Sequence, residues 1–245
     1  MSPVPITVTV EGRAGAGAPE IGRLVARELG FDFVDRLLLA DIAKRAGATV
    51  GALAGHERKV PTATSRLAQA VQRMLHRSAV AGMGGDPYFG PGIETLLAKP
   101  YRELEESPAT TAEEVDEQRF ITTTAEVIRK IAEEGNCVIL SRGGGAILRG
   151  NPKVLRVGVM AHFEDRVTRI MQRERLSDAD AKEFIRHSDV AQHRYFERAF
   201  KSSPLDPFLY HFMWNTSELS DEFATQVIVD AARRLADNRL RLPAQ

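Results

Sequence analysis

Cysteine is almost missing from this sequence: Cys137 is the only one among 245 residues, which excludes an intrachain disulfide. Such cysteine usage is typical of a reducing compartment. The sequence also has no excess of charge of either sign, because Lys+Arg and Asp+Glu both number 33. It therefore gives no indication of a nucleic acid or an anionic membrane surface as a partner.

Long apolar runs are missing as well. No stretch of the sequence approaches about 18 uninterrupted apolar residues, so we predict no transmembrane helix. The segment Met1–Val10 has no basic region followed by a long apolar run, which argues against a signal peptide. We therefore expect a cytoplasmic protein without a membrane partner.

Patterns typical of metal sites are absent from the sequence too. The six histidines have no ligand spacing, and His187 and His193, for example, lie six residues apart. We therefore expect no metal–histidine site. Cys137 precedes an apolar run, and we interpret it as a small buried side chain and not as a catalytic thiol.

What the sequence does contain is an alternation of strand and helix patterns. The expected strands cover residues 6–10, 31–34, 137–140, 154–160 and 208–213, and the expected helices cover 19–29, 118–134, 164–175, 177–200 and a segment after Ser220. This alternation predicts an α/β fold with a parallel sheet covered by helices on both faces. Ligands of such sheets bind at the edge where the strands end.

The alternation is interrupted between residues 48 and 117. This segment combines a helical pattern, a loop rich in Gly and Pro at 82–92, and an acidic run at 103–117. We therefore predict a core formed by residues 1–47 and 118–245, with a helical insert at 48–117. The insert is expected to be an acceptor-binding or interaction lobe.

A glycine-rich loop joins the first expected strand to the first expected helix. It consists of Gly12, Arg13, Ala14, Gly15, Ala16, Gly17 and Ala18. In this position, a loop points backbone N–H groups and a helix N-terminus at an anion. The sequence therefore predicts a phosphate site at residues 12–18, and the alternative is a tight turn that binds nothing.

The loop departs from the full P-loop pattern, G-x-x-x-x-G-K-[ST]. Its first and last glycines match, but Ala18 stands at the lysine position and Pro19 at the position of the Mg²⁺-binding hydroxyl. A backbone cradle survives these changes, whereas the lysine charge and the hydroxyl ligand are lost. Arg13 and Arg142 are the residues that we expect to supply part of the charge.

Five short segments follow one another in an order that is informative as a set. They are Gly15–Ile21, similar to G-S-G-G-R-E-I; Gly30–Arg36, a strand ending in an aspartate; Ser141–Gly143, similar to a G-R-G turn; Ile170–Ser177, similar to I-M-E-R-E-G-L-S; and Asn215–Ser217 before a closing helix. In this order they resemble the cytidylate-kinase-like family, a branch of the P-loop nucleoside monophosphate kinases. Residues 60–118 carry little of the resemblance.

The resemblance implies ATP-dependent phosphoryl transfer, with Mg²⁺, to a nucleoside monophosphate, and CMP or dCMP is the expected acceptor. Arg142 matches the arginine that faces the acceptor phosphate, and Asp35 with Arg36 lies at the nucleoside end of the second strand. Residues 164–200 resemble the lid, whose arginines close over the transferring group. The lid candidates are Arg173, Arg186 and Arg194.

Two further positions depart from the family pattern. The lid element D-x-x-R ends here in Gln192, and Gly143 stands where cytidylate kinases carry an acidic residue. Together with the changed loop, these departures leave two alternatives open. The chain could be a non-catalytic nucleotide-binding or interaction module, or a kinase for another small acceptor. The expected partners are nucleotide ligands, and homo-oligomerisation remains open.

Overall fold

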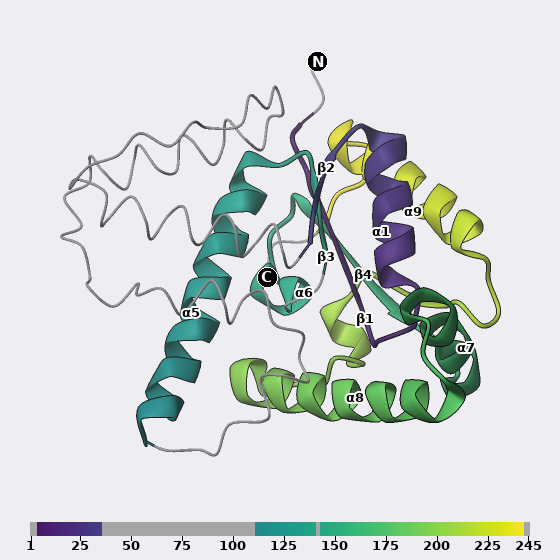
Figure 1. Ribbon diagram of the computed structural model, residues 1–245. Helices are drawn as coiled ribbons and strands as arrows, with labels where there is room; N and C mark the ends of the chain where they lie inside the picture. The colour runs from purple at the N-terminus through teal and green to yellow at the C-terminus, as the bar shows by residue number, and fades with distance from the viewer. Residues whose placement is uncertain (1–3, 36–110, 141–142, 243–245) are drawn as a thin grey trace, which may run out of the picture.

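A parallel sheet of five strands forms the centre of the computed structural model, which describes residues 4–35, 111–140 and 143–242 (Figure 1). The strands are β1 (Thr7–Gly12), β2 (Asp32–Val34), β3 (Cys137–Leu140), β4 (Val154–Met160) and β5 (Phe212–Asn215). Their spatial order is β2-β3-β1-β4-β5, and every neighbouring pair is parallel. The predicted α/β fold is therefore confirmed.

Helices cover both faces of this sheet. They are α1 (Ala18–Leu29), α5 (Thr111–Glu134), α6 (Gly144–Ile147), α7 (Phe163–Glu174), α8 (Asp178–Phe200) and α9 (Asp221–Ala236), with a short 3-10 helix η3 (Pro207–Leu209). Figure 1 shows α1 and α9 together on one face and α5 on the other. It also shows α7 and α8 gathered at the end of the sheet where β1 ends.

The side chains of β1 explain why this strand lies in the middle of the sheet. Val8 and Val10 are completely buried on the face covered by α1 and α9. The alternate residues Thr7, Thr9 and Glu11 are buried as well. A strand that is buried on both faces is expected at the centre of a parallel sheet. Thr7 and Glu11 have hydrogen-bond partners inside the protein, whereas the hydroxyl of Thr9 has none among the described residues.

The pair α7–α8 has a small core of its own, formed by Val167, Ile170, Ala181 and Ile185. Ser177 begins α8 as a cap, because its hydroxyl accepts a hydrogen bond from the N–H of Asp180 (3.2 Å). Ser220 begins α9 in the same way, with its hydroxyl accepting from the N–H of Phe223 (3.2 Å). These two helices correspond to the segment 164–200 that was expected to be a lid.

The last strand differs from the prediction of residues 208–213, because β5 covers Phe212–Asn215 and η3 precedes it. Asp206 caps η3 by accepting a hydrogen bond from the N–H of Phe208 (2.9 Å), and Pro207 opens the turn. Phe208 is 78% exposed, so the apolar run that suggested a strand there is not a run of buried side chains.

The predicted boundary between insert and core falls inside a helix. Residues 111–117 belong to α5, so this helix begins before the expected end of the insert. The rest of the insert lies outside the described residues, and the division into core and insert stays a prediction. Among the described residues, no helix combines the length and the apolar character needed to cross a membrane.

Candidate phosphate-binding site

The loop between β1 and α1 has the geometry of an open backbone cradle. Gly15 and Gly17 have φ angles of 80° and 92°, which glycine adopts without strain. The N–H of Ala16 donates to the carbonyl of Arg13 (3.0 Å) and closes a turn. Among the described residues, no acceptor is present for the N–H groups of Ala14, Gly15 and Gly17. Gly15 and Gly17 are themselves buried beneath α7. N–H groups of such a loop are the kind that bind an anion.

Both left-handed glycines are also points of close approach to α7. A Cβ atom at Gly15 would lie 2.6 Å from the carbonyl oxygen of Arg166. A Cβ atom at Gly17 would overlap the guanidinium group of Arg169. The absence of side chains at these two positions therefore allows α7 to pack directly on the loop.

Arg166, on α7, joins the loop to α7 and α8. Its Nε donates to the carbonyl of Ala14 (2.8 Å), and its Nη1 and Nη2 donate to the two carboxylate oxygens of Asp189 (2.9 and 2.6 Å). Its side chain is only 4% exposed. Nη1 of Arg13 lies 3.5 Å from the same carboxylate. Because all three nitrogens of Arg166 are in use, this residue fixes the shape of the loop.

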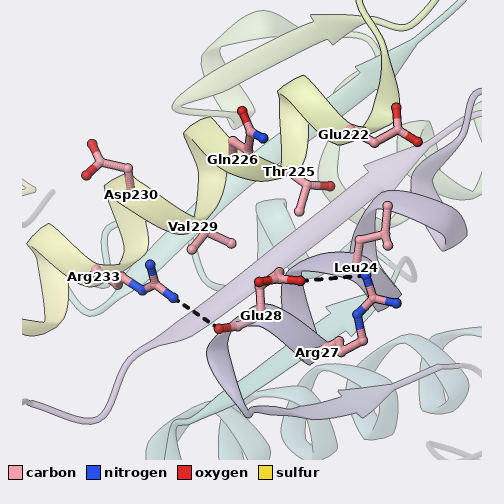
Figure 2. A pocket seen from close by; sticks show the side chains of 9 residues that line it. All are labelled: Leu24, Arg27, Glu28, Glu222, Thr225, Gln226, Val229, Asp230 and Arg233. Carbon is pink, nitrogen blue, oxygen red and sulfur yellow. Dashed lines mark hydrogen bonds and ion pairs between the residues drawn. The ribbon is translucent and has the colours of Figure 1, made fainter.

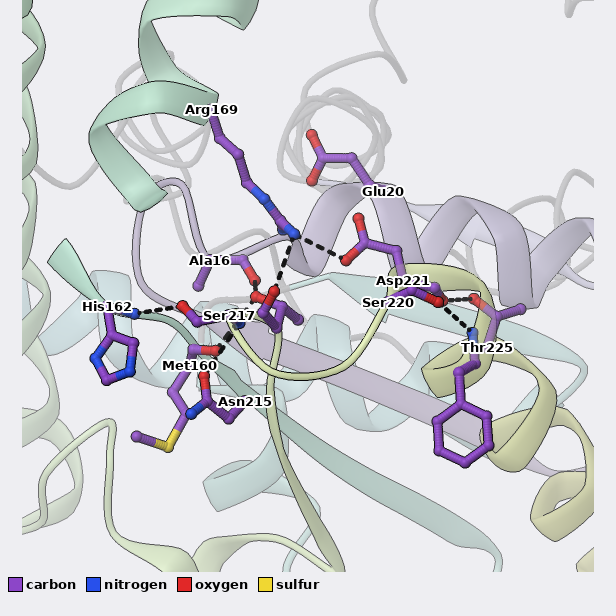
Figure 3. A network of polar contacts seen from close by, with 12 residues as sticks. Ala16, Glu20, Met160, His162, Arg169, Asn215, Ser217, Ser220, Asp221 and Thr225 are labelled. Atoms are coloured by element: carbon purple, nitrogen blue, oxygen red, sulfur yellow. Dashed lines mark hydrogen bonds and ion pairs between the residues drawn. The ribbon is translucent and has the colours of Figure 1, made fainter. Parts of the chain in front are cut away.

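Arg169 lies one helical turn further along α7, against Gly17 (Figure 3). Its Nη2 donates to Asp221 Oδ1 (3.1 Å) and to the carbonyl of Thr216 (3.4 Å). Its Nη1 is buried and has no acceptor among the described residues. Burial raises the pKa of Asp221, and the nearby Arg169 partly opposes that rise. Arg169 thus differs from Arg166 in having an unused donor.

Thr216 supports the loop from the end of β5. Its hydroxyl donates to the carbonyl of Ala16 (2.9 Å) and lies 3.3 Å from the carbonyl of Met160. Beside it, Ser217 Oγ accepts a hydrogen bond from the N–H of His162 (2.8 Å), as Figure 3 shows. The segment Asn215–Ser217, which the sequence analysis singled out, therefore holds the loop in place.

Glu11, the residue before the loop, is a buried carboxylate with 1% of its surface exposed. One oxygen accepts from the N–H of Gly143 (3.0 Å), and the other accepts from Nε2 of Gln192 (3.2 Å). Gln192 Nε2 also lies 3.4 Å from the carbonyl of Gly12. The glutamine that replaces the expected lid arginine is thus a partner of a buried glutamate.

Residues 12–18, which were predicted to form the loop, lie together between β1 and α1. One of them, Arg13, also contacts Asp189 of α8. The predicted lid arginines lie apart from one another. Arg173 donates to Glu174 (2.9 Å) and lies 3.5 Å from Glu20, and Arg186 stacks over the ring of Phe163 at 5.7 Å. Arg194 is exposed on α8.

Of the three predicted acceptor-site residues, the structure describes only Asp35. Asp35 directly follows β2 at the edge of the sheet where the strands end. Arg36 and Arg142 lie outside the described residues, so their roles stay predictions. The structure also places Arg166 and Arg169 at the loop, which the sequence analysis did not. The spacing of Arg166 and Arg169 on a helix was the available signal, because residues three apart share a face.

Among the described residues, those beside the loop do not form a clear set of ligands for the implied Mg²⁺ ion. Among the described residues, no three His, Cys, Asp or Glu side chains form a group that could hold a metal. The loop has no hydroxyl at Ala18 or Pro19, and the carboxylates of Asp189 and Asp221 are bound to arginines. The N–H groups of Ala14, Gly15 and Gly17, which have no acceptor in the described part of the chain, suit phosphate oxygens.

A second hollow of about 450 Å³ lies between α1 and α9 (Figure 2). Its lining residues are Leu24, Arg27, Glu28, Glu222, Thr225, Gln226, Val229, Asp230 and Arg233. Charges of both signs surround it, and Arg233 Nη2 donates across it to the carbonyl of Glu28 (3.2 Å). This mixed lining does not point to one class of ligand.

Comparison with known proteins places the chain in a family. The model of the cytidylate kinase-like family matches residues 7–218. An uncharacterized protein from Eubacterium ventriosum ATCC 27560 has a similar structure, with a TM-score of 0.59 and 15% identity over 93% of this chain and 98% of that one. No protein with a curated description matches.

Two other solved structures are less similar. The protein TT1252 from Thermus thermophilus has a TM-score of 0.46 and 21% identity, covering 93% of this chain and 97% of that one. Shikimate kinase from Bacteroides thetaiotaomicron has a TM-score of 0.43 and 15% identity, covering 95% and 98%. The match of the family model extends from the first residue of β1 to the turn after β5, and the chain belongs to the cytidylate kinase-like family.

Proposed function

We propose that this protein binds the phosphates of a nucleotide at residues 12–18 and transfers a phosphoryl group to a small acceptor. CMP and dCMP are the first acceptors to test, because the chain belongs to the cytidylate kinase-like family. One observation carries the proposal: the N–H groups of Ala14, Gly15 and Gly17 are free of acceptors among the described residues, beside the N-terminus of α1. This is the arrangement that binds phosphate elsewhere.

The loop holds this shape through contacts from the lid helices and β5. Arg166 holds the carbonyl group of Ala14, and Thr216 holds that of Ala16. Held in this way, the two carbonyl oxygens point away from an anion bound in the loop. Phosphoryl transfer depends mainly on positioning and on neutralising charge. A loop that is fixed before the nucleotide arrives supplies the first of these two requirements.

A non-catalytic nucleotide-binding module is the second candidate, and the charges around the loop favour it. Each described arginine beside the loop contacts a carboxylate: Arg13 and Arg166 contact Asp189, Arg169 contacts Asp221, and Arg173 contacts Glu20. The charge of a loop lysine is missing. In this candidate the chain binds nucleotide but transfers phosphoryl groups slowly or not at all.

Calorimetric titration with ATP, with and without Mg²⁺, and with CMP tests nucleotide binding directly. A coupled assay of ADP release with CMP, dCMP, other nucleoside monophosphates and shikimate then tests transfer. ATP binding with acceptor-dependent ADP release supports the kinase. ATP binding without release by any acceptor supports the non-catalytic module. If the chain binds none of these nucleotides, the proposal is wrong.

The acceptor side of the site is proposed by extension from the family pattern. Arg142 would face the acceptor phosphate, and Asp35 with Arg36 would lie near the nucleoside. Arg173, Arg186 and Arg194 would act from the lid. At present Arg173 contacts Glu20 and Glu174, and Arg186 stacks on Phe163. Loss of CMP affinity on Arg142→Ala, with an unchanged melting temperature, would support this assignment.

A further inference from the structure

The loop sequence has Ala18 where the P-loop pattern has a lysine. We propose that Arg169, from helix α7, supplies to the bound phosphates the charge that a loop lysine would supply. This inference rests on the proposed binding of nucleotide phosphates at residues 12–18. It concerns which cation serves that site.

The position of Arg169 is the first observation. Its guanidinium group occupies the space where a side chain at Gly17 would lie. Gly17 is the residue immediately before α1, and Ala18, which stands at the lysine position, is the first residue of that helix. The cation on α7 therefore lies beside the same helix N-terminus that a lysine at position 18 would serve.

The unused donor of Arg169 is the second observation. Nη2 is held by Asp221 Oδ1 (3.1 Å) and the carbonyl of Thr216 (3.4 Å), whereas Nη1 has no acceptor in the described part of the chain. A buried N–H group without an acceptor is unfavourable, so a phosphate oxygen that reaches it gains a charge-assisted hydrogen bond.

The other arginines near the loop are less suited to this role. Arg166 uses Nε, Nη1 and Nη2 in hydrogen bonds to Ala14 and Asp189. Arg13 lies within the loop, but its nearest acid is the same Asp189, at 3.5 Å. Nε of Arg13 is also buried and has no acceptor among the described residues. Arg13 is therefore the rival that an experiment must separate from Arg169.

The test measures binding of inorganic pyrophosphate and of ATP to the full chain by calorimetry. Arg169→Met keeps an unbranched side chain without the charged guanidinium group, and Arg169→Lys keeps a charge. We expect Arg169→Met to weaken both ligands by about tenfold to a hundredfold, the usual effect of losing a charge-assisted contact. We expect Arg169→Lys to stay within about threefold of the parent protein, because a point charge can also bind phosphate.

Two more variants serve as comparisons. Arg234→Met removes the same charge from an exposed position on α9 (59% exposed) and should leave binding unchanged. Arg13→Met should weaken binding less than Arg169→Met. Each variant is also melted with and without pyrophosphate, because a ligand that binds the folded state raises the melting temperature. That rise should be lost in Arg169→Met and kept in Arg169→Lys, even if the two proteins differ in stability.

Different failures have different meanings. If the parent protein binds pyrophosphate and Arg169→Met binds it equally well, the assignment to Arg169 is wrong while the proposed function stands. The same conclusion follows if Arg13→Met alone loses binding. If the parent protein binds neither pyrophosphate nor ATP, both the proposed function and this inference are wrong.

Discussion

The ring of Phe200, at the end of α8, fills the space that a side chain at Gly143 would need. Gly143 also has a φ angle of 74°, in the left-handed region. An acidic residue, expected at this position from the family pattern, would require Phe200 to move and would adopt a left-handed backbone. The glycine at position 143 is therefore matched by the packing of Phe200 at the end of α8.

Replacing Gly143 should destabilise the protein through both effects. We expect Gly143→Ala to lower the free energy of unfolding by about 2–4 kcal/mol, since the left-handed backbone and the overpacked ring both add cost. Gly30 has a φ angle of 66° with no atom near a built Cβ, so Gly30→Ala measures the backbone effect alone. Urea denaturation of both variants provides the comparison. Equal losses in the two variants would show that Phe200 simply moves aside.

The buried pair of Arg166 and Asp189 should matter more than an exposed pair. Arg166→Met leaves the Asp189 carboxylate without its bidentate partner, and we expect a loss of about 3–5 kcal/mol in the free energy of unfolding. Arg234 and Asp230 form a close pair on the surface, with Nε 2.7 Å from Oδ2. Arg234→Met should cost less than about 1 kcal/mol. Similar melting temperatures for the two variants would contradict this ranking.

Cys137 should not react while the protein is folded. Burial raises the pKa of its thiol to about 12, so almost no thiolate is present at neutral pH. A thiol-specific reagent such as Ellman's reagent should label the native protein only as fast as the chain unfolds. In denaturant the labelling should be immediate. Rapid labelling of the native protein, at a rate independent of unfolding, would show that the strand β3 opens locally.

His211 should make the stability depend on pH. Its Nδ1 accepts the backbone N–H of Arg156 (3.0 Å), and burial together with the nearby Arg156 guanidinium lowers its pKa to about 4. The unfolded chain binds this proton near pH 6.5, whereas the folded chain does not. Stability contributed by the neutral ring is therefore present above about pH 6.5 and is lost as the pH falls toward 4, by at most about 3 kcal/mol.

Measurements of unfolding free energy between pH 7 and pH 4 test this dependence. His211→Asn keeps an acceptor for the Arg156 N–H but cannot be protonated, so its stability should fall less steeply than that of the parent protein. His162→Asn is the control, because His162 is 69% exposed. Parallel curves for the parent protein and His211→Asn would mean that His211 does not titrate differently on folding.

Much of the fold could be predicted from the sequence because the strands are short apolar runs bounded by turns. The prediction for β3 and β4 matches their observed bounds, and the parallel sheet follows from the alternation with helices. The strand at β5 was displaced because Phe208 is apolar and yet exposed. An apolar side chain on a capped turn has the same sequence signal as one on a strand.

The loop could also be predicted, but its partners could not. Glycines between a strand and a helix are visible in the sequence, whereas the contacts of Arg166 with Ala14 and Asp189 join segments far apart in the chain. Several arginines lie in the lid segment, and their number does not indicate which of them faces the loop. Glu11 was missed because its partners, Gly143 and Gln192, come together only in the fold.

The hydrogen bonds of Arg166 have a consequence for how a nucleotide would arrive and depart. Arg166 joins α7, α8 and the loop through Ala14 and Asp189, so a movement of the lid helices strains the loop unless this buried pair breaks first. The loop is thus ordered before any ligand binds. The entropic cost of ordering it is part of the free energy of folding and does not reduce the affinity for a ligand. Nucleotide exchange would then be governed by smaller side-chain movements at the rim of the cradle, without a large opening of the lid.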